Sequence, residues 1–248
     1  MYICVIALFS NQDHPVNQFL YMKFGVVVFP GSNCDRDMME ALQNDLQQEV
    51  IQLWHKDKDL GMFSTEDCIV LPGGFSYGDY LRCGAIARFS PMMQSVIEFA
   101  NKGGKVLGIC NGFQILCESG LLPGVLLRNS QQQFVCNNVF IKEAAAEGAH
   151  NPSTPLRIPV AHGEGRFFAN EATLETMEMH RQVIYRYCDE KGNVNAAANP
   201  NGAIHNIAGI CNKERNVYGM MPHPERAVSI ALGNNDGKNV FNHLFGIN

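Results

Sequence analysis

Hydrophobic residues along this chain alternate between short continuous runs and longer segments in which they recur every three or four positions. Residues 24–29 (FGVVVF) are β-branched or aromatic apart from one glycine, and the run ends at Pro30-Gly31, as expected of a buried strand. The same criteria predict strands at 50–54, 67–71 and 105–109, and helices at 35–46, 92–100 and 113–119. Alternating strands and helices predict an α/β fold with a mostly parallel sheet that helices flank on both faces.

The second half of the chain has a less regular pattern. Further strands are predicted at 131–141, 156–162, 183–187, 204–211 and 217–221, and a closing helix at 238–245. No internal repeat, low-complexity tract or linker separates these segments from the first half, so we expect a single domain.

The first 21 residues are expected to lie outside this domain. Residues 1–10 (MYICVIALFS) are apolar, but the run is too short to span a bilayer and lacks the basic region that opens a secretory signal. Met22 and Lys23 directly precede the first predicted strand. We therefore predict one domain at 22–248 and an N-terminal extension at 1–21, which either stays apart from the domain or packs on its surface.

Composition and charge exclude several classes of function. The chain has 248 residues, 46% of them hydrophobic, and a net charge of −5, which suits an ordinary globular protein. It has no Lys/Arg cluster, so neither nucleic acid nor a membrane is an expected partner. The nine cysteines include no C-x-x-C pair, which argues against a thiolate zinc site, and their odd number indicates reduced thiols in the cytoplasm. No P-loop or G-x-G-x-x-G motif indicates a bound nucleotide.

Residues 105–120 (KVLGICNGFQILCESG) carry the strongest chemical signal. A predicted strand runs into Cys110, glycines lie two residues away on either side, and a helix follows at once. This is the G-x-nucleophile-x-G elbow with cysteine at the nucleophile position. The turn sets the sulfur above the sheet edge and at a helix N-terminus, where free N–H groups and the helix dipole favour a thiolate. Cys110 is therefore the candidate nucleophile, whereas Cys117 is expected to be a buried structural thiol.

A thiolate nucleophile needs a base and a group that orients the base. Residues 221–226 (MPHPER) offer both, because Pro224 biases His223 toward an extended conformation. Residues two apart in an extended chain point to the same side. Glu225 is therefore expected to accept a hydrogen bond from the His223 ring and to fix its tautomer.

Two further segments are candidates for the same site. Residues 72–74 (PGG) follow a predicted strand, and such a turn leaves backbone N–H groups free to stabilise a developing oxyanion. The N–H groups of Gly74 and Asn111 are the expected pair of donors. A second H-x-E occurs at 162–164, but the P-C-x-x-C segment of zinc deaminases is absent, so we assign His162 a structural or site-lining role.

Several sequence blocks together resemble the class I glutamine amidotransferases. They are GICNGFQ at 108–114, PGGFSYGDYLRCGAIAR at 72–88, PVAHGEG at 159–165 and GMMPHPERA at 219–227, and FPGSNCDRD at 29–37 also fits. Within that family, the blocks are similar to those of the glutaminase subunits of phosphoribosylformylglycinamidine synthase. The resemblance extends from about Met22 to the C-terminus and does not include residues 1–21.

The resemblance implies a flavodoxin-like sheet with a nucleophile elbow and a triad at Cys110, His223 and Glu225. Cys110 would attack the side-chain amide of L-glutamine, and Gln114 would help to hold this substrate. No cofactor or metal bound by this chain is implied. The ammonia would pass to a large synthetase subunit that uses ATP and magnesium, in a complex with a small third subunit that serves de novo purine biosynthesis. The loop at 77–82 (YGDYLR) is left without an assigned role.

Two other functions are weighed against this one. A cysteine hydrolase of the intracellular peptidase or deglycase type shares the fold, but the H-P-E and G-x-C-x-G-x-Q blocks argue against it. A non-catalytic assembly subunit is the third, and the three filled triad positions argue against that. Ammonia release from glutamine, compared with peptide cleavage, separates the two enzymes, and alkylation of Cys110 by a glutamine-like chloroketone tests for a scaffold.

Overall fold

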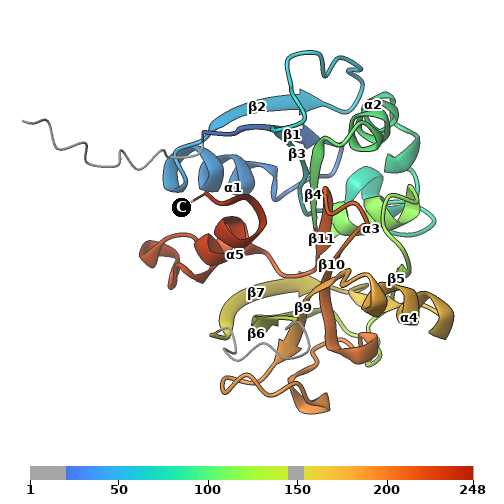
Figure 1. Ribbon diagram of the computed structural model, residues 1–248, viewed down its shortest axis with the longest axis vertical. Coiled ribbons are helices and arrows are strands. Elements are labelled where there is room, and N and C mark those ends of the chain that lie inside the picture. The colour runs from blue at the N-terminus through green and yellow to red at the C-terminus, as the bar shows by residue number, and fades with distance from the viewer. Residues whose placement is uncertain (1–20, 145–153, 248) are drawn as a thin grey trace, which may run out of the picture.

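The computed structural model describes residues 21–144 and 154–247, and Figure 1 shows their arrangement around one large sheet. Nine strands form this sheet in the order β2-β1-β3-β4-β11-β10-β9-β6-β7. They are β1 (Lys23–Val28), β2 (Glu49–Trp54), β3 (Cys68–Leu71), β4 (Lys105–Ile109), β6 (Val135–Glu143), β7 (Leu156–His162), β9 (Val183–Cys188), β10 (Ile207–Cys211) and β11 (Val217–Met220). A separate two-stranded sheet pairs β5 (Val125–Leu127) with β8 (Arg166–Phe168).

The large sheet changes character at β11. From β2 to β11 neighbouring strands are parallel, whereas from β11 to β7 they are antiparallel. Val26, Ile69 and Val70 in the parallel part have no exposed surface. Burial on both faces explains the continuous apolar runs that predict these strands. The predicted parallel sheet is found in β1 to β4 and β11, and the sheet as a whole is mixed.

The helices lie on both sides of the sheet. They are α1 (Asp35–Glu40, continued by a π-helical turn at Ala41–Asp45), α2 (Pro91–Asn101), α3 (Asn111–Glu118), α4 (Glu171–Met179) and α5 (Asp236–Phe245). In Figure 1, α1 and α5 lie on one side of the sheet, and α2 and α3 on the other. α2 starts at the predicted place because Ser90 accepts a hydrogen bond from the Met93 N–H at 3.2 Å and Pro91 occupies the first turn. Within the two described ranges, no helix has the length and apolarity that crossing a membrane requires.

The sequence pattern does not predict α4, β5 or β8. α4 buries only Leu174 and Met177, which are too few apolar positions to produce a helical pattern. Its start is fixed instead by Asn170, whose side chain accepts a hydrogen bond from the Thr173 N–H at 2.9 Å. β5 and β8 contain three residues each, so their alternation is too short to recognise.

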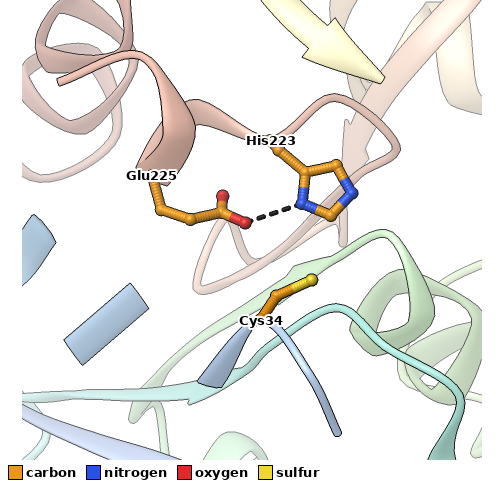
Figure 2. A group of neighbouring side chains, drawn as sticks. All are labelled: Cys34, His223 and Glu225. Atoms are coloured by element: carbon orange, nitrogen blue, oxygen red, sulfur yellow. Dashed lines mark hydrogen bonds and ion pairs between the residues drawn. The ribbon is translucent and has the colours of Figure 1, made fainter. Parts of the chain in front are cut away.

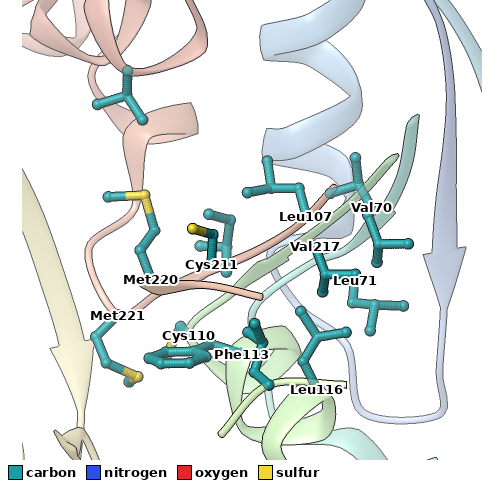
Figure 3. Packing of buried hydrophobic residues seen from close by; sticks show 14 of the residues in the cluster. Val70, Leu71, Leu107, Cys110, Phe113, Leu116, Cys211, Val217, Met220 and Met221 are labelled. Carbon is teal, nitrogen blue, oxygen red and sulfur yellow. The ribbon is translucent and has the colours of Figure 1, made fainter. Parts of the chain in front are cut away.

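Hydrophobic side chains pack tightly around the junction of β4 and α3 (Figure 3). Leu71 from β3, Leu107 from β4 and Val217 from β11 belong to this core, together with Phe113 and Leu116 from α3. Each of these side chains is at most 1% exposed. The strand that carries the candidate nucleophile and the helix that follows it are therefore both fixed by packing.

Deleting residues 1–21 is expected to leave the melting temperature of the domain almost unchanged. Residues 1–20 lie outside the described part of the chain, and the description begins with an exposed Tyr21 and a buried Met22. The N–H of Met22 donates to Gln48 Oε1 at 2.8 Å, so the domain already has contacts of its own at this point. Thermal unfolding of the full and truncated chains checks the prediction. A decrease of more than a few degrees, equivalent to about 1 kcal/mol, would show that the extension packs into the domain.

Candidate active site

The backbone turns sharply where β4 meets α3. Cys110 occupies this turn with φ 51° and ψ −103°, a conformation that residues other than glycine rarely adopt. Gly112 is required for space and not for the turn, because a Cβ at this position would lie 1.9 Å from the carbonyl oxygen of Leu71. The strain of the elbow therefore falls on Cys110 itself, and the glycine allows α3 to approach β3 closely.

Three segments meet at the C-terminal ends of the parallel strands β3, β4 and β11. Because parallel strands end at the same edge of a sheet, residues 72–74, Cys110 and residues 221–223 lie close together. A Cβ on Gly73 would lie 2.7 Å from His223 Cε1 and 3.4 Å from Cys110 Cβ. Glycine at position 73 thus leaves the room that the imidazole and the elbow need.

His223 and Glu225 form a buried pair (Figure 2). His223 Nδ1 lies 2.6 Å from Glu225 Oε1, and each residue is 1% exposed. The N–H of His223 donates to the carbonyl of Pro159 at 2.8 Å, which fixes the backbone before the pair. The predicted contact is present, but a 3-10 turn at Pro224–Arg226 brings the two side chains together in place of the expected extended chain.

The His223 ring is arranged to hold and transfer a proton. Burial by itself lowers the pKa of His223, but the charge of Glu225 and the thiols of Cys110 and Cys34 outweigh it, so the pKa lies well above its ordinary value. Nε2 of His223 is buried and has no hydrogen-bond partner among the described residues. Because Nδ1 is engaged by Glu225, Nε2 is the nitrogen available to a reacting group.

A second thiol lies beside this pair. Cys34 Sγ, a ring nitrogen of His223 and a carboxylate oxygen of Glu225 lie within 4.8 Å of one another (Figure 2). Thiolate, imidazole and carboxylate are zinc ligands, so this trio has the composition of a metal site. The 2.6 Å separation of His223 and Glu225, however, is that of a hydrogen bond, and we interpret the two as sharing a proton.

A cavity of about 370 Å³ opens beside these residues, and Cys110, Gln114 and His223 line it. Its lining includes an ion pair at the solvent side, in which Arg128 Nε lies 3.5 Å from Glu164 Oε1. The Arg128 side chain is 78% exposed, so this pair faces the solvent. A small cavity with both charges available suits a zwitterionic amino acid.

Further lining residues are absent from the sequence-based assignment. They are Asn33, Cys34, Phe75, Asp79, Cys83, Arg128, Phe134, Ala161, Gly163, Glu164 and Arg226. Most of them lie inside the blocks at 29–37, 72–88, 159–165 and 219–227, so membership of those blocks was the sequence signal that could have indicated them. Arg128 and Phe134 lie outside every block, and no sequence feature marks them.

Asn111 is held firmly at the start of α3. Its Oδ1 accepts a hydrogen bond from the Ser76 N–H at 3.1 Å, and its Nδ2 donates to Gln114 Oε1 at 2.9 Å. Gln114 Nε2 in turn donates to the carbonyl of Glu164 at 2.6 Å, so both ends of its amide are bonded within the protein. The other candidate oxyanion donor, Gly74, lines the cavity with φ 141°. The backbone that carries the Asn111 donor is thereby fixed.

His162 lines the cavity and also supports its wall. The ring is 3% exposed, with Nδ1 3.2 Å from Asn129 Oδ1 and Nε2 3.5 Å from Asn201 Nδ2. Burial, and to a smaller extent the nearby His223, lowers the pKa of His162 to about 4, so its ring is neutral at physiological pH. His162 therefore lies where it can serve both roles that the sequence left open, lining the site and supporting its structure.

The loop at 77–82 is attached to both ends of α3. Asp79 Oδ1 accepts a hydrogen bond from Asn111 Nδ2 at 3.2 Å, at the start of the helix. Arg82 forms a bidentate ion pair with Glu118 at the end of the helix, with N–O distances of 2.5 and 2.6 Å. Burial raises the pKa of the Asp79 carboxyl. A displacement of this loop would therefore act on the helix that begins directly after Cys110.

A strained cysteine above a parallel sheet edge, next to a buried His–Glu pair, is the arrangement of a cysteine amidotransferase or hydrolase. Residues 22–239 match the model of the CobB/CobQ-like glutamine amidotransferase domain, and the chain belongs to this family of glutamine amidotransferases. This family membership favours an amidotransferase over a peptidase or deglycase.

Individual relatives place the chain more closely. It is 53% identical over 227 residues to phosphoribosylformylglycinamidine synthase subunit PurQ of Gloeobacter violaceus, which covers 90% of this chain and 97% of that protein. It is 56% identical over 227 residues to the PurQ subunit of Moorella thermoacetica, with 88% and 92% covered. The solved structure of PurLQS from Thermotoga maritima matches with a TM-score of 0.77 and 39% identity, over 92% of this chain and 99% of that chain. The predicted family and the predicted class I amidotransferase fold are thereby confirmed.

Proposed function

We propose that this chain is the glutaminase subunit of phosphoribosylformylglycinamidine synthase in de novo purine biosynthesis. The relatives at 53% and 56% identity, which are subunits of that enzyme, support this function. The observation that carries the chemistry is the buried hydrogen bond between His223 and Glu225. It leaves Nε2 of His223 without a hydrogen-bond partner among the described residues, and His223 lines the same cavity as the strained Cys110.

The geometry supports a nucleophilic attack by Cys110. The Cys110 thiolate bonds to the amide carbon of the glutamine side chain, and the carbonyl oxygen becomes an oxyanion. Backbone N–H groups of Gly74 and Asn111 stabilise this oxyanion. Nε2 of His223 gives its proton to the departing nitrogen, so that ammonia leaves and a γ-glutamyl thioester remains.

The second half of the reaction uses the same base. Nε2 of His223 takes a proton from a water molecule, which attacks the thioester carbon. The bond to sulfur breaks, glutamate forms, and Cys110 is regenerated. Glu225 holds the imidazole in one tautomer and stabilises its positive charge in both halves. Gln114 and the Arg128–Glu164 pair face the remaining part of the substrate in the cavity.

The ammonia is consumed elsewhere in a larger complex. This chain has no nucleotide-binding motif, so ATP and magnesium belong to a large synthetase subunit, which a small third subunit accompanies. The likeness to the PurLQS structure from Thermotoga maritima supports an assembly of this kind. The eight described cysteines are all free, which supports action in the reducing cytoplasm.

Apolar side chains near the cavity are exposed where a partner would cover them. Leu81 is 94% exposed and Tyr80 75%, and both belong to the loop that is tied to α3. Phe75 and Phe134 line the cavity and are 47% and 56% exposed. Exposed apolar groups of this kind mark protein interaction sites.

Binding of the synthetase subunit with its ligands is expected to raise glutaminase turnover by about tenfold or more, a typical coupling between linked sites. Docking on the loop at 77–82 would be transmitted through Asp79 to Asn111, which carries an oxyanion donor. Ammonia release is measured for the free chain and for the assembled complex. Equal turnover in the two states would contradict the prediction.

Matched variants test the route of this activation. Leu81→Asp should abolish most of the increase. Met179→Asp should preserve it, since Met179 is 76% exposed but lines a separate cavity beside α4. Co-purification from the native cell identifies the partner directly, and recovery without a synthetase subunit would argue against the proposed function.

A further inference from the structure

Arg226 directly follows Glu225 in the chain, yet its guanidinium is bonded to residues at the start of α1 and forms no ion pair with that carboxylate. Nε and Nη2 of Arg226 each lie 2.9 Å from Asp37 Oδ2, and Nη2 also donates to Cys34 Sγ at 3.2 Å. Throughout the described ranges, Arg226 makes no ion pair within 4.0 Å other than this one with Asp37. Two residues around the start of α1 thus hold the cation that neighbours the triad in sequence.

Glu225 offers a vacant acceptor to any nearby cation. Its Oε1 is bonded to His223 Nδ1, whereas Oε2 is buried and has no hydrogen-bond partner among the described residues. A guanidinium binds carboxylates strongly, often through two parallel hydrogen bonds in a bidentate pair. An unrestrained Arg226 would therefore compete with His223 for Glu225 and offset its charge.

We propose that Asp37 and Cys34 are positioning residues of the triad, which hold Arg226 away from Glu225 and so reserve that carboxylate for His223. The inference rests on the catalytic role proposed above for His223 and Glu225. A purely structural role for the Asp37–Arg226 pair is a weaker explanation, because its side chains are 43% and 34% exposed and pairs of that exposure contribute little to stability.

The sign of the electrostatic effect follows from the groups around each side chain. His223 is faced by Glu225, Cys110, Cys34 and His162, while Arg226 is faced by Asp37, Cys34 and Glu225. Glu225 is the main group that raises the pKa of His223 against the effect of burial. A guanidinium on Glu225 would weaken this attraction, so the pKa of His223 would fall and the imidazolium that forms during turnover would be less stable.

Asp37→Asn provides the test, with Arg226→Gln as the compensating change. In the full-length chain, Asp37→Asn should lower the pKa of His223, followed by NMR of labelled histidine, and lower kcat by about tenfold with KM nearly constant. Adding Arg226→Gln should restore the pKa of His223, because the competing charge is then absent. The pKa is the readout for this double variant, since Arg226 also lines the cavity. Asp35→Asn is the matched control, since Asp35 lies on the same short helix and forms no ion pair within the part of the chain that is described.

The outcomes separate this inference from the proposed function. An unchanged His223 pKa and kcat in Asp37→Asn would overturn the inference, and so would a fall in the His223 pKa that Arg226→Gln does not reverse. Cys34→Ala removes the second acceptor and also a thiol that raises the pKa of His223 directly, so only the part of its shift that Arg226→Gln reverses counts as support. This pair of variants serves if Asp37→Asn unfolds. The NMR titration of His223 tests this inference without any turnover. The proposed function is contradicted by a different result, namely glutamine hydrolysis that persists without Cys110.

Discussion

Replacing Cys110 with alanine in the assembled complex is expected to lower glutamine-dependent synthesis by several orders of magnitude, in line with the loss of other triad nucleophiles. No thioester can form without the sulfur, and no other described cysteine has the strained backbone of the elbow. Synthesis from ammonium salt at mildly alkaline pH should continue, because the synthetase chemistry takes place on the partner and consumes ammonia. Product formation with each nitrogen source measures both activities in one preparation.

Cys117→Ala is the matched control for this prediction. Cys117 lies on the same helix, α3, and its thiol donates to the carbonyl of Pro123 at 3.8 Å, so it has a structural contact and no place in the cavity. This variant should keep glutamine-dependent synthesis. Activity retained with glutamine in Cys110→Ala would place the nucleophile elsewhere. Loss of ammonia-dependent synthesis in a correctly assembled Cys110→Ala complex would show that Cys110 serves assembly or the synthetase step.

Replacing His223 with alanine is expected to lower glutamine hydrolysis by about a thousandfold or more, even though Cys110 remains in place. A thiol without a base is a poor nucleophile, and the departing nitrogen then has no proton donor. Steady-state ammonia release measures the loss. The rate at which a glutamine-like chloroketone alkylates Cys110 should fall as well, which shows that the thiol itself has become less reactive.

Two further variants bracket the effect of His223→Ala. Glu225→Ala should be milder, because Glu225 orients and polarises the ring without transferring a proton to the substrate. His180→Ala should have no effect on hydrolysis, since His180 follows α4 and lines a different cavity. Near-normal hydrolysis in His223→Ala would remove His223 from the mechanism and leave the base unassigned.

The parallel strands were predictable because their signal is local. A strand that is buried on both faces has a continuous apolar run, and β1, β3 and β4 each contain one, which follows the opening lysine in β1 and β4. Cys110 was predictable for a similar reason, since an elbow needs its nucleophile and its glycines within five consecutive residues. α4 escaped prediction because its amphipathic face is weak and Asn170, a capping residue outside any apolar pattern, sets its start.

The antiparallel half of the sheet was predictable as strands but not in its direction. The strands β6, β7, β9 and β10 each have an apolar signal of their own, whereas the direction of each depends on which neighbour it pairs with. Pairing is decided by contacts between distant segments, such as Val135 with His162. The sequence therefore determined that the second half contains strands, and the tertiary structure determined that they run antiparallel.

The sequence by itself singled out Cys110, His223 and Glu225, because each lies in a short segment whose local geometry restricts the role proposed for it. Only the tertiary structure decided what surrounds them. Arg226 reaches Asp37 across 189 residues and Cys34 across 192, and the packing of α1 against the turn after β11 creates both contacts. A separation of that size leaves no periodicity or spacing in the sequence, since the contact depends on how the sheet arranges its strand ends and not on the residues between them.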